Sequence, residues 1–191
     1  MHHGFKDAEA WAKVFDDPAR DAWQQPDTVL AVLDLHPSTV VADIGAGTGY
    51  FSVRIARVVT AGKVIATDIE PDMIHYLTDR AKREGLANLQ AVATPPDDPQ
   101  LAAASVDRML VVDVWHHLGD RGAYAKKLAA GLRSGGMLAI VDFKLEAEHG
   151  PPKELRLAPE TIMADLRAAG FVNVEVAPTL LPEQYIVLAH H

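Results

Sequence analysis

A glycine-rich segment in the first third of the chain is the strongest candidate for chemistry. Residues 43–49 read Asp-Ile-Gly-Ala-Gly-Thr-Gly and follow a short run rich in β-branched residues at 39–44. Glycines at alternate positions allow a tight turn, and they let a ligand approach the backbone more closely than a Cβ would permit. The first N–H groups of a helix that follows such a turn favour a polar ligand. The residues expected to bind a cofactor here are Asp43, Gly45, Ala46, Gly47, Thr48 and Gly49.

The spacing of the glycines distinguishes between two cofactors. A dinucleotide fingerprint has the pattern Gly-x-Gly-x-x-Gly. Here the third glycine comes one residue early, and Tyr50 stands where that pattern has glycine. Asp43, two residues before the first glycine, fits a ligand with an ammonium group better than one with a pyrophosphate. A cofactor that carries both a carboxylate and an ammonium suits this turn, and S-adenosylmethionine is such a molecule.

A second acidic residue ends the next apolar run. Asp68 follows residues 63–67, and a carboxylate in that position can accept hydrogen bonds from both hydroxyls of a ribose. Nicotinamide enzymes place an acid similarly, so Asp68 indicates a nucleoside but does not distinguish a nicotinamide dinucleotide from S-adenosylmethionine. Ile69 and Met73 are then expected to form a wall against the adenine ring.

Polar residues also follow the apolar run at 106–112. Because ligands of open α/β sheets bind beyond the carboxyl ends of the strands, we expect Asp113 in the cofactor site and His116 against the substrate. His117 is predicted to act as a general base, since histidine ordinarily titrates near neutral pH. The alternative is that one histidine caps the next helix while the other fills space.

Two aromatic residues are candidates for the substrate pocket. Trp23 and Tyr185 each lie near the end of an expected element, where an aromatic side chain can line a pocket mouth. Packing in the hydrophobic core is the alternative for both.

The elements that would position these residues alternate between strands and helices. Apolar periodicity predicts strands at 39–44, 63–68, 89–93, 106–112 and 137–143, with helices between them. This alternation predicts a doubly wound α/β fold with a mostly parallel sheet. Two further strands, 171–176 and 184–188, have a short connection that requires an antiparallel pair. We expect a helical N-terminal segment at 1–35 and a cofactor-binding domain at 36–191.

Composition narrows the class of partner. The 191 residues correspond to one domain, and the net charge of −8 argues against nucleic acid, which normally requires a basic face. A small-molecule substrate is therefore expected, with the oligomeric state left open.

No cysteine is present, no His/Asp/Glu cluster has metal-ligand spacing, and no apolar run is long enough for a signal peptide or a bilayer span. These features predict a cytoplasmic protein without membrane insertion.

Four segments resemble the class I methyltransferase superfamily: residues 43–49, 68–71, 113–118 and 132–138. Within it the chain is similar to small bacterial enzymes related to ubiquinone/menaquinone-biosynthesis and arsenite methyltransferases, although arsenite activity needs cysteines. The resemblance implies a seven-stranded sheet in the order 3-2-1-4-5-7-6 with strand 7 antiparallel. It also implies that the loop after the third strand contacts adenine, where Thr94 stands in place of the aspartate of many relatives.

Three functional hypotheses follow. The first is an S-adenosylmethionine-dependent methyltransferase that acts on a small molecule by in-line displacement. The second is an NAD(P)-dependent oxidoreductase on a similar sheet. The third is a non-catalytic module that binds S-adenosylmethionine for sensing or assembly.

Overall fold

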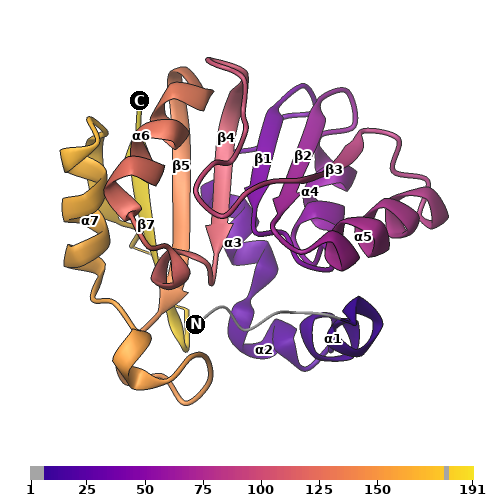
Figure 1. Ribbon diagram of the computed structural model, residues 1–191, viewed down its shortest axis with the longest axis horizontal. Coiled ribbons are helices and arrows are strands. Elements are labelled where there is room, and N and C mark those ends of the chain that lie inside the picture. Colours follow the sequence, from indigo (N-terminus) through magenta and orange to yellow (C-terminus); the bar gives the residue numbers. More distant parts are fainter. Residues whose placement is uncertain (1–6, 179–180) are drawn as a thin grey trace.

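A seven-stranded sheet in the order β3-β2-β1-β4-β5-β7-β6 crosses the computed structural model, which describes residues 7–178 and 181–191 (Figure 1). The strands are β1 (Val40–Ile44), β2 (Lys63–Asp68), β3 (Leu89–Ala93), β4 (Val106–Val112), β5 (Leu132–Phe143), β6 (Val172–Val176) and β7 (Gln184–His190). The first five strands pair in parallel, whereas β7 runs antiparallel to both β5 and β6. The predicted doubly wound fold, strand order and antiparallel last strand are confirmed.

The strand register brings three strand ends to one edge of the sheet. Ile44, the last residue of β1, lies opposite Thr67 of β2 and Val111 of β4. The glycine turn after β1, the carboxylate that ends β2 and the loop after β4 therefore share this edge, which we call the carboxyl edge.

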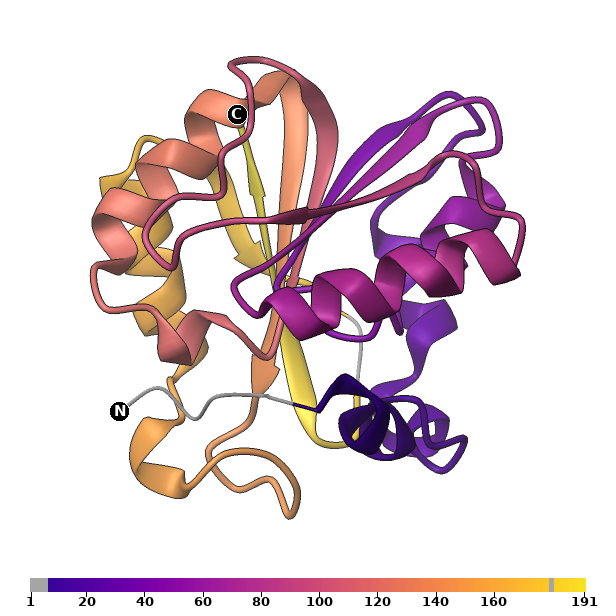
Figure 2. The same ribbon diagram turned by 45° about the vertical axis from the view of Figure 1, so that its right-hand side comes forward.

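Helices cover both faces of the sheet. One hydrophobic cluster joins the sheet to α3 (Pro26–Val32), α4 (Ser52–Val58) and α5 (Pro71–Arg83). A second cluster joins the opposite face to α6 (Arg121–Gly131) and α7 (Pro159–Ala168), which lie together in Figure 2. Successive residues of β1 enter different clusters, as Val41 and Ala42 do, because side chains of a strand alternate between faces.

The sequence of α5 explains its position and its limits. Pro71 occupies the first turn, where a missing N–H costs nothing. Met73, Leu77 and Ala81 recur at helical spacing and are buried. Gly85 follows the helix with a φ of +68°, a left-handed conformation that glycine adopts freely.

The start of β5 differs from the prediction. We expected the strand to begin at Met137, whereas it begins at Leu132, directly after α6. Leu132 lies opposite Val106 and Met137 lies opposite Arg108, so residues 133–136 form a bulge. Gly135, with a φ of +77°, permits this bulge, which periodicity alone does not reveal.

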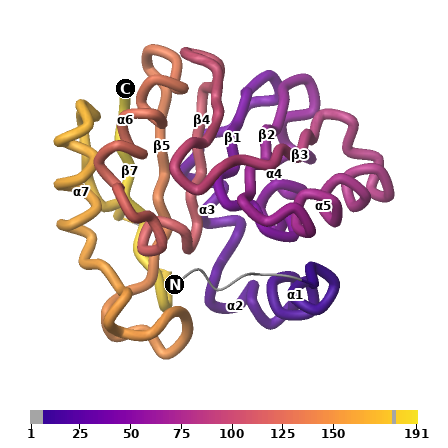
Figure 3. Tube along the Cα trace, viewed as in Figure 1, coloured from indigo at the N-terminus to yellow at the C-terminus, as the bar shows by residue number. Residues whose placement is uncertain are grey.

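The N-terminal helices lie over the carboxyl edge. Figure 1 shows α1 (Ala8–Phe15) and α2 (Arg20–Gln24) beyond the ends of the parallel strands, beside the loop that follows β5. The tube in Figure 3 shows the chain passing from these helices to α3 and then into the sheet. The predicted boundary at residue 35 falls between α3 and β1. Within residues 7–178 and 181–191, no helix has the length and hydrophobicity needed to cross a membrane.

Candidate active site

The glycine turn is tied by its backbone to the end of β2. The N–H groups of Gly45 and Ala46 donate to the carbonyl of Thr67, at 2.8 and 2.9 Å. The N–H of Gly47 donates to Oδ2 of Asp68 at 2.8 Å, and the N–H of Glu70 donates to Oδ1 at 2.9 Å. Asp68 is therefore held against the turn, and each carboxylate oxygen retains a lone pair for a ligand. Burial raises the pKa of this carboxyl.

Two glycines of the turn are required for different reasons. A Cβ on Gly45, whose φ is +72°, would lie 2.3 Å from Cγ2 of Val114, so packing excludes a side chain there. A Cβ on Gly47, whose φ is +55°, would come no closer than 3.6 Å, to the ring of Phe15 in α1. A single methyl group would therefore fit at Gly47 in ordinary contact with Phe15, so the positive φ and not packing favours glycine there. Thr48 adds a buried hydroxyl that has no hydrogen-bond partner among the described residues.

Asp43 lies beneath the turn at the end of β1. Its Oδ2 accepts a hydrogen bond from the hydroxyl of Ser52 at 2.5 Å, and the side chains of both residues are buried. Burial raises the pKa of Asp43 to about 6, although the hydrogen bond from Ser52 opposes the shift. Two acidic residues thus adjoin the glycine turn: Asp43, buried before it, and Asp68, which accepts a hydrogen bond from Gly47.

Asp113 lies at the end of β4 in a conformation that is rare for a residue with a side chain. Its φ is +59°, and its N–H donates to the carbonyl of Val141 at 3.0 Å. Its Oδ1 accepts a 2.5 Å hydrogen bond from Nε2 of Gln184, and its Oδ2 lies 3.9 Å from Nη2 of Arg20. Burial raises the pKa of Asp113 to about 7, against the attraction of Arg20. This acid lies next to the turn, because Val114 contacts Gly45.

The two predicted histidines have different environments. Nδ1 of His116 lies 2.9 Å from Oδ1 and 3.1 Å from Oδ2 of Asp142, near the end of β5, and both side chains are almost completely buried. His117 is exposed and packs on the His116 ring, with 4.1 Å between ring centres. Neither histidine caps the following helix, since the side chain of Asp120 does so. Asp142 therefore orients His116.

The residues predicted to surround adenine lie at the carboxyl ends of β2 and β3. The N–H of Thr94 donates to the carbonyl of Asp68 at 3.0 Å, so these two residues are neighbours. Ile69 is 41 % exposed, as a residue that forms the wall of an open site would be. Met73 is 1 % exposed and lies beneath the surface. The roles of all three in adenine binding stay predictions.

The predicted substrate residues are separated. Trp23 of α2 stacks on His149 with 5.6 Å between ring centres and contacts Phe143 at 5.7 Å, so aromatic rings gather beside the end of β5. Tyr185 is buried in β7 and donates its hydroxyl to the carbonyl of Leu157 at 2.8 Å. Trp23 thus belongs to an aromatic cluster, whereas Tyr185 is fixed to the segment before α7 (Pro159–Ala168), and the substrate role of both stays a prediction.

Several polar residues of the site were not predicted. Gln24 and Gln184 are both fully buried and hydrogen-bonded to each other, and Gln184 continues the chain of hydrogen bonds to Asp113. Arg20 stacks on the ring of Tyr50, directly after the glycine turn, with its Cζ 4.1 Å from the ring centre. Asp142 was also missed. A charged residue inside an otherwise apolar strand was a signal for Asp142, but no local pattern marks Arg20 or Gln24.

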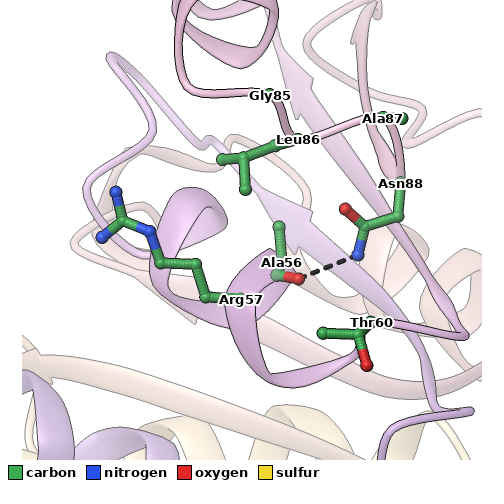
Figure 4. Close-up of a pocket in the computed structure, with 7 residues that line it drawn as sticks. All are labelled: Ala56, Arg57, Thr60, Gly85, Leu86, Ala87 and Asn88. Atoms are coloured by element: carbon green, nitrogen blue, oxygen red, sulfur yellow. Dashed lines mark hydrogen bonds between the residues drawn. The ribbon is translucent and has the colours of Figure 1, made fainter.

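A separate hollow of about 580 Å³ opens near the amino end of β3 (Figure 4). Its lining consists of Ala56, Arg57, Thr60, Gly85, Leu86, Ala87 and Asn88. Nδ2 of Asn88 donates to the carbonyls of Ala56 and Val59, both at 2.9 Å, and so satisfies the last turn of α4. No predicted site residue lines this hollow, and its polar contacts serve the fold.

Across residues 7–178 and 181–191, no cluster of three or more His, Asp or Glu side chains could hold a metal ion.

Fold and site together define a doubly wound α/β protein whose glycine turn and β2 carboxylate fit a nucleoside cofactor with an amino-acid tail. Residues 41–136, just over half of the chain, match the family described as "Methyltransferase domain". The protein belongs to this family. A crystal structure of an S-adenosylmethionine-dependent methyltransferase from Aquifex aeolicus is similar over 96 % of this chain and 97 % of that chain, with a TM-score of 0.87 and 26 % identity.

Curated relatives agree on methyl transfer. Erythromycin 3''-O-methyltransferase of Saccharopolyspora erythraea is 28 % identical over 71 % of this chain and 51 % of its own length. The 27-O-demethylrifamycin SV methyltransferase of Amycolatopsis mediterranei is 29 % identical over 76 % of this chain and 52 % of its own. The chain thus spans about half the length of these relatives. The predicted superfamily and its cofactor, S-adenosylmethionine, are confirmed, and the nicotinamide hypothesis loses its support. The narrower similarity to quinone-biosynthesis enzymes stays a prediction.

Proposed function

We propose that this protein transfers a methyl group from S-adenosylmethionine to a hydroxyl group of a small molecule. The buried pair of His116 and Asp142 at the carboxyl edge is the observation that carries the proposal. The names of the two curated relatives, which specify oxygen as the acceptor atom, favour the same chemistry. The acidic net charge of −8 favours a small molecule over nucleic acid.

The cofactor, when bound, supplies a methyl group that is already electrophilic. Asp43, Asp68 and the turn from Gly45 to Gly49 are the groups that would hold it, together with the adenine residues Ile69, Met73 and Thr94. The protein must then hold the acceptor oxygen in line with the methyl group. In well-aligned intramolecular models, such positioning contributes about 7–11 kcal/mol to the lowering of the barrier.

An alcohol must also lose a proton as the new bond forms, and His116 is suited to accept it. A carboxylate accepts hydrogen bonds, so the contact with Asp142 assigns the imidazole proton to Nδ1 and leaves Nε2 as the basic atom. Asp142 would also stabilise the imidazolium that forms. These contacts support His116 as the base in preference to His117, which was predicted from sequence and is exposed.

The aromatic side chains near this pair favour an acceptor with a flat or apolar portion. Trp23 of α2 packs against Phe143 and His149, and Phe143 directly follows Asp142 in the chain. Trp23 and His116 are the side chains that we expect the acceptor to contact, and its binding must open access to the His116 ring, whose side chain is 2 % exposed. A cytoplasmic location and the absence of membrane insertion stay predictions.

Transfer of a labelled methyl group to a panel of small alcohols and phenols tests the proposal. We expect His116→Ala to lower kcat about 10²- to 10⁴-fold, the range for a lost general base. Asp142→Asn should lower kcat at least about tenfold, because an asparagine does not stabilise the imidazolium. His117→Ala is the matched control and should stay within about threefold of the wild type.

Two results would overturn this mechanism. A large loss in His117→Ala with none in His116→Ala would make His117 the base. Tight binding of S-adenosylhomocysteine without turnover on any acceptor would instead favour the non-catalytic module.

A further inference from the structure

Arg20 is a buried cation beside the glycine turn. Its side chain is 14 % exposed, and its guanidinium lies over the ring of Tyr50, the residue that follows Gly49. Nη1 donates to the carbonyl of Phe15 at 2.9 Å, and the Phe15 ring faces Gly47. The guanidinium therefore lies beside the glycine turn, near the Phe15 ring that packs over Gly47.

The hydrogen-bond partners of Arg20 are neutral. Besides the Phe15 carbonyl, Oε1 of Gln24 accepts from Nε at 3.1 Å and from Nη2 at 2.9 Å. A guanidinium has five N–H donors, and these contacts use three of them. One donor on Nη1 and one on Nη2 make no hydrogen bond to any residue in 7–178 or 181–191.

The nearest carboxylate, that of Asp113, forms a long ion pair with this cation but no hydrogen bond. Oδ2 of Asp113 is 3.9 Å from Nη2, beyond hydrogen-bond distance. Asp16 is engaged by Arg80 at 2.8 Å, and Asp43 is engaged by Ser52 at 2.5 Å. Burial lowers the pKa of Arg20, against the opposing charges of Asp113 and Asp16.

The methionine part of S-adenosylmethionine carries a carboxylate and an ammonium on the same carbon. We propose that Arg20 binds this carboxylate through its remaining Nη1 and Nη2 donors, while Asp113 faces the ammonium. Guanidinium pairs with carboxylate through two parallel hydrogen bonds, which matches the two remaining donors. The proposal rests on the cofactor of the proposed function and extends the site to the N-terminal helices.

Arg54 offers a matched control. It also lies over Tyr50, with its Cζ 4.0 Å from the ring centre. Unlike Arg20, it donates hydrogen bonds to a carboxylate, because Nη2 lies 3.1 and 3.3 Å from Oδ1 and Oδ2 of Asp21. Loss of Arg54 removes a cation from the same ring without removing the carboxylate site.

The test compares S-adenosylmethionine with decarboxylated S-adenosylmethionine, which lacks only the carboxylate, in calorimetric titrations of the full chain. We expect the wild type to prefer the intact cofactor at least about 30-fold, consistent with a charge-assisted hydrogen-bonded pair. Arg20→Met should reduce this preference to about threefold or less and leave affinity for the decarboxylated compound within about threefold. Arg54→Met should keep the wild-type preference.

Equal weakening of both ligands in Arg20→Met would show that Arg20 only supports the fold, and an unchanged preference would show that the carboxylate binds elsewhere. Either result overturns the proposal. If Arg20→Met does not fold, Arg20→Lys decides, because a lysine lacks the planar pair of donors and should lower the preference at least about threefold. A folded wild type that binds neither compound would refute the cofactor assignment itself, a failure distinct from loss of the Arg20 contact alone.

Discussion

The side-chain amide of Gln24 donates a hydrogen bond to the side-chain oxygen of Gln184, and both residues are fully buried. Gln24 ends α2, whereas Gln184 begins β7 and donates in turn to Asp113. The N-terminal helices are therefore connected through one buried amide pair to the end of β4. Because a buried polar group is costly without a partner, this pair fixes α2 over the carboxyl edge.

Removal of one member of the pair should destabilise the fold. We expect Gln24→Ala to lower the free energy of unfolding by about 1–3 kcal/mol, since it leaves the Gln184 oxygen unsatisfied. Urea denaturation measures this quantity. Gln90→Ala, at an exposed position of β3, should change it by less than about 0.5 kcal/mol. Equal effects of the two substitutions would show that the buried pair contributes nothing beyond a surface glutamine.

Asp68 should contribute directly to cofactor affinity. Asp68→Asn keeps the shape of the side chain but loses its charge and replaces one accepting oxygen with a donor. A hydrogen bond to a charged group contributes about 1.5–3 kcal/mol, so affinity for S-adenosylhomocysteine should fall about 10- to 100-fold in calorimetry. Asp79→Asn, on the exposed side of α5, should leave this affinity unchanged. Unaltered binding by Asp68→Asn would refute the ribose contact.

The two glycines of the turn should respond differently to alanine. Gly45→Ala forces a Cβ into Val114 and should lower the free energy of unfolding by about 2–4 kcal/mol. Gly47→Ala meets only ordinary contacts, so its cost should be the left-handed backbone strain of about 1–2 kcal/mol. The folded Gly47→Ala protein should nevertheless bind S-adenosylhomocysteine at least about tenfold more weakly. Denaturation and calorimetry on the same samples separate these effects, and full cofactor affinity in Gly47→Ala would contradict the site.

Asp113 should make stability depend on pH. Burial raises its pKa to about 7, so the folded protein holds a proton that the unfolded chain releases at lower pH. This contribution to stability is complete below the unfolded pKa and is lost as the pH rises through about 7. Arg20, His116, Asp142 and Gln184 are the groups that face or influence this carboxyl.

Comparison with Asp113→Asn isolates this contribution. Between pH 5 and 8, the wild type should lose at least about 1 kcal/mol of unfolding free energy relative to Asp113→Asn. Denaturation curves at several pH values measure the difference. Parallel pH profiles for the two proteins would mean that Asp113 keeps its ordinary pKa.

Much of the candidate cofactor site was proposed from local sequence, and its binding role stays a prediction. The glycine turn follows β1, while Asp43 and Asp68 lie near or at the ends of β1 and β2. The parallel register aligns these strand ends at one edge. The strand order came from resemblance rather than from periodicity, and the bulge at the start of β5 was missed. A bulge depends on how two strands pair, and the sequence of one strand does not show its register with the neighbouring strand.

The sequence by itself determined the doubly wound fold and the glycine turn at which we propose that the cofactor binds, because their signals lie among neighbouring residues. Only the tertiary structure decided that Asp142 orients His116 rather than His117, and that Gln24 meets Gln184 from 160 residues away. It also brought Arg20 over the ring of Tyr50. Such side-chain contacts form when distant elements pack together. The hydrophobic periodicity of each segment does not show which residues of another segment it will meet.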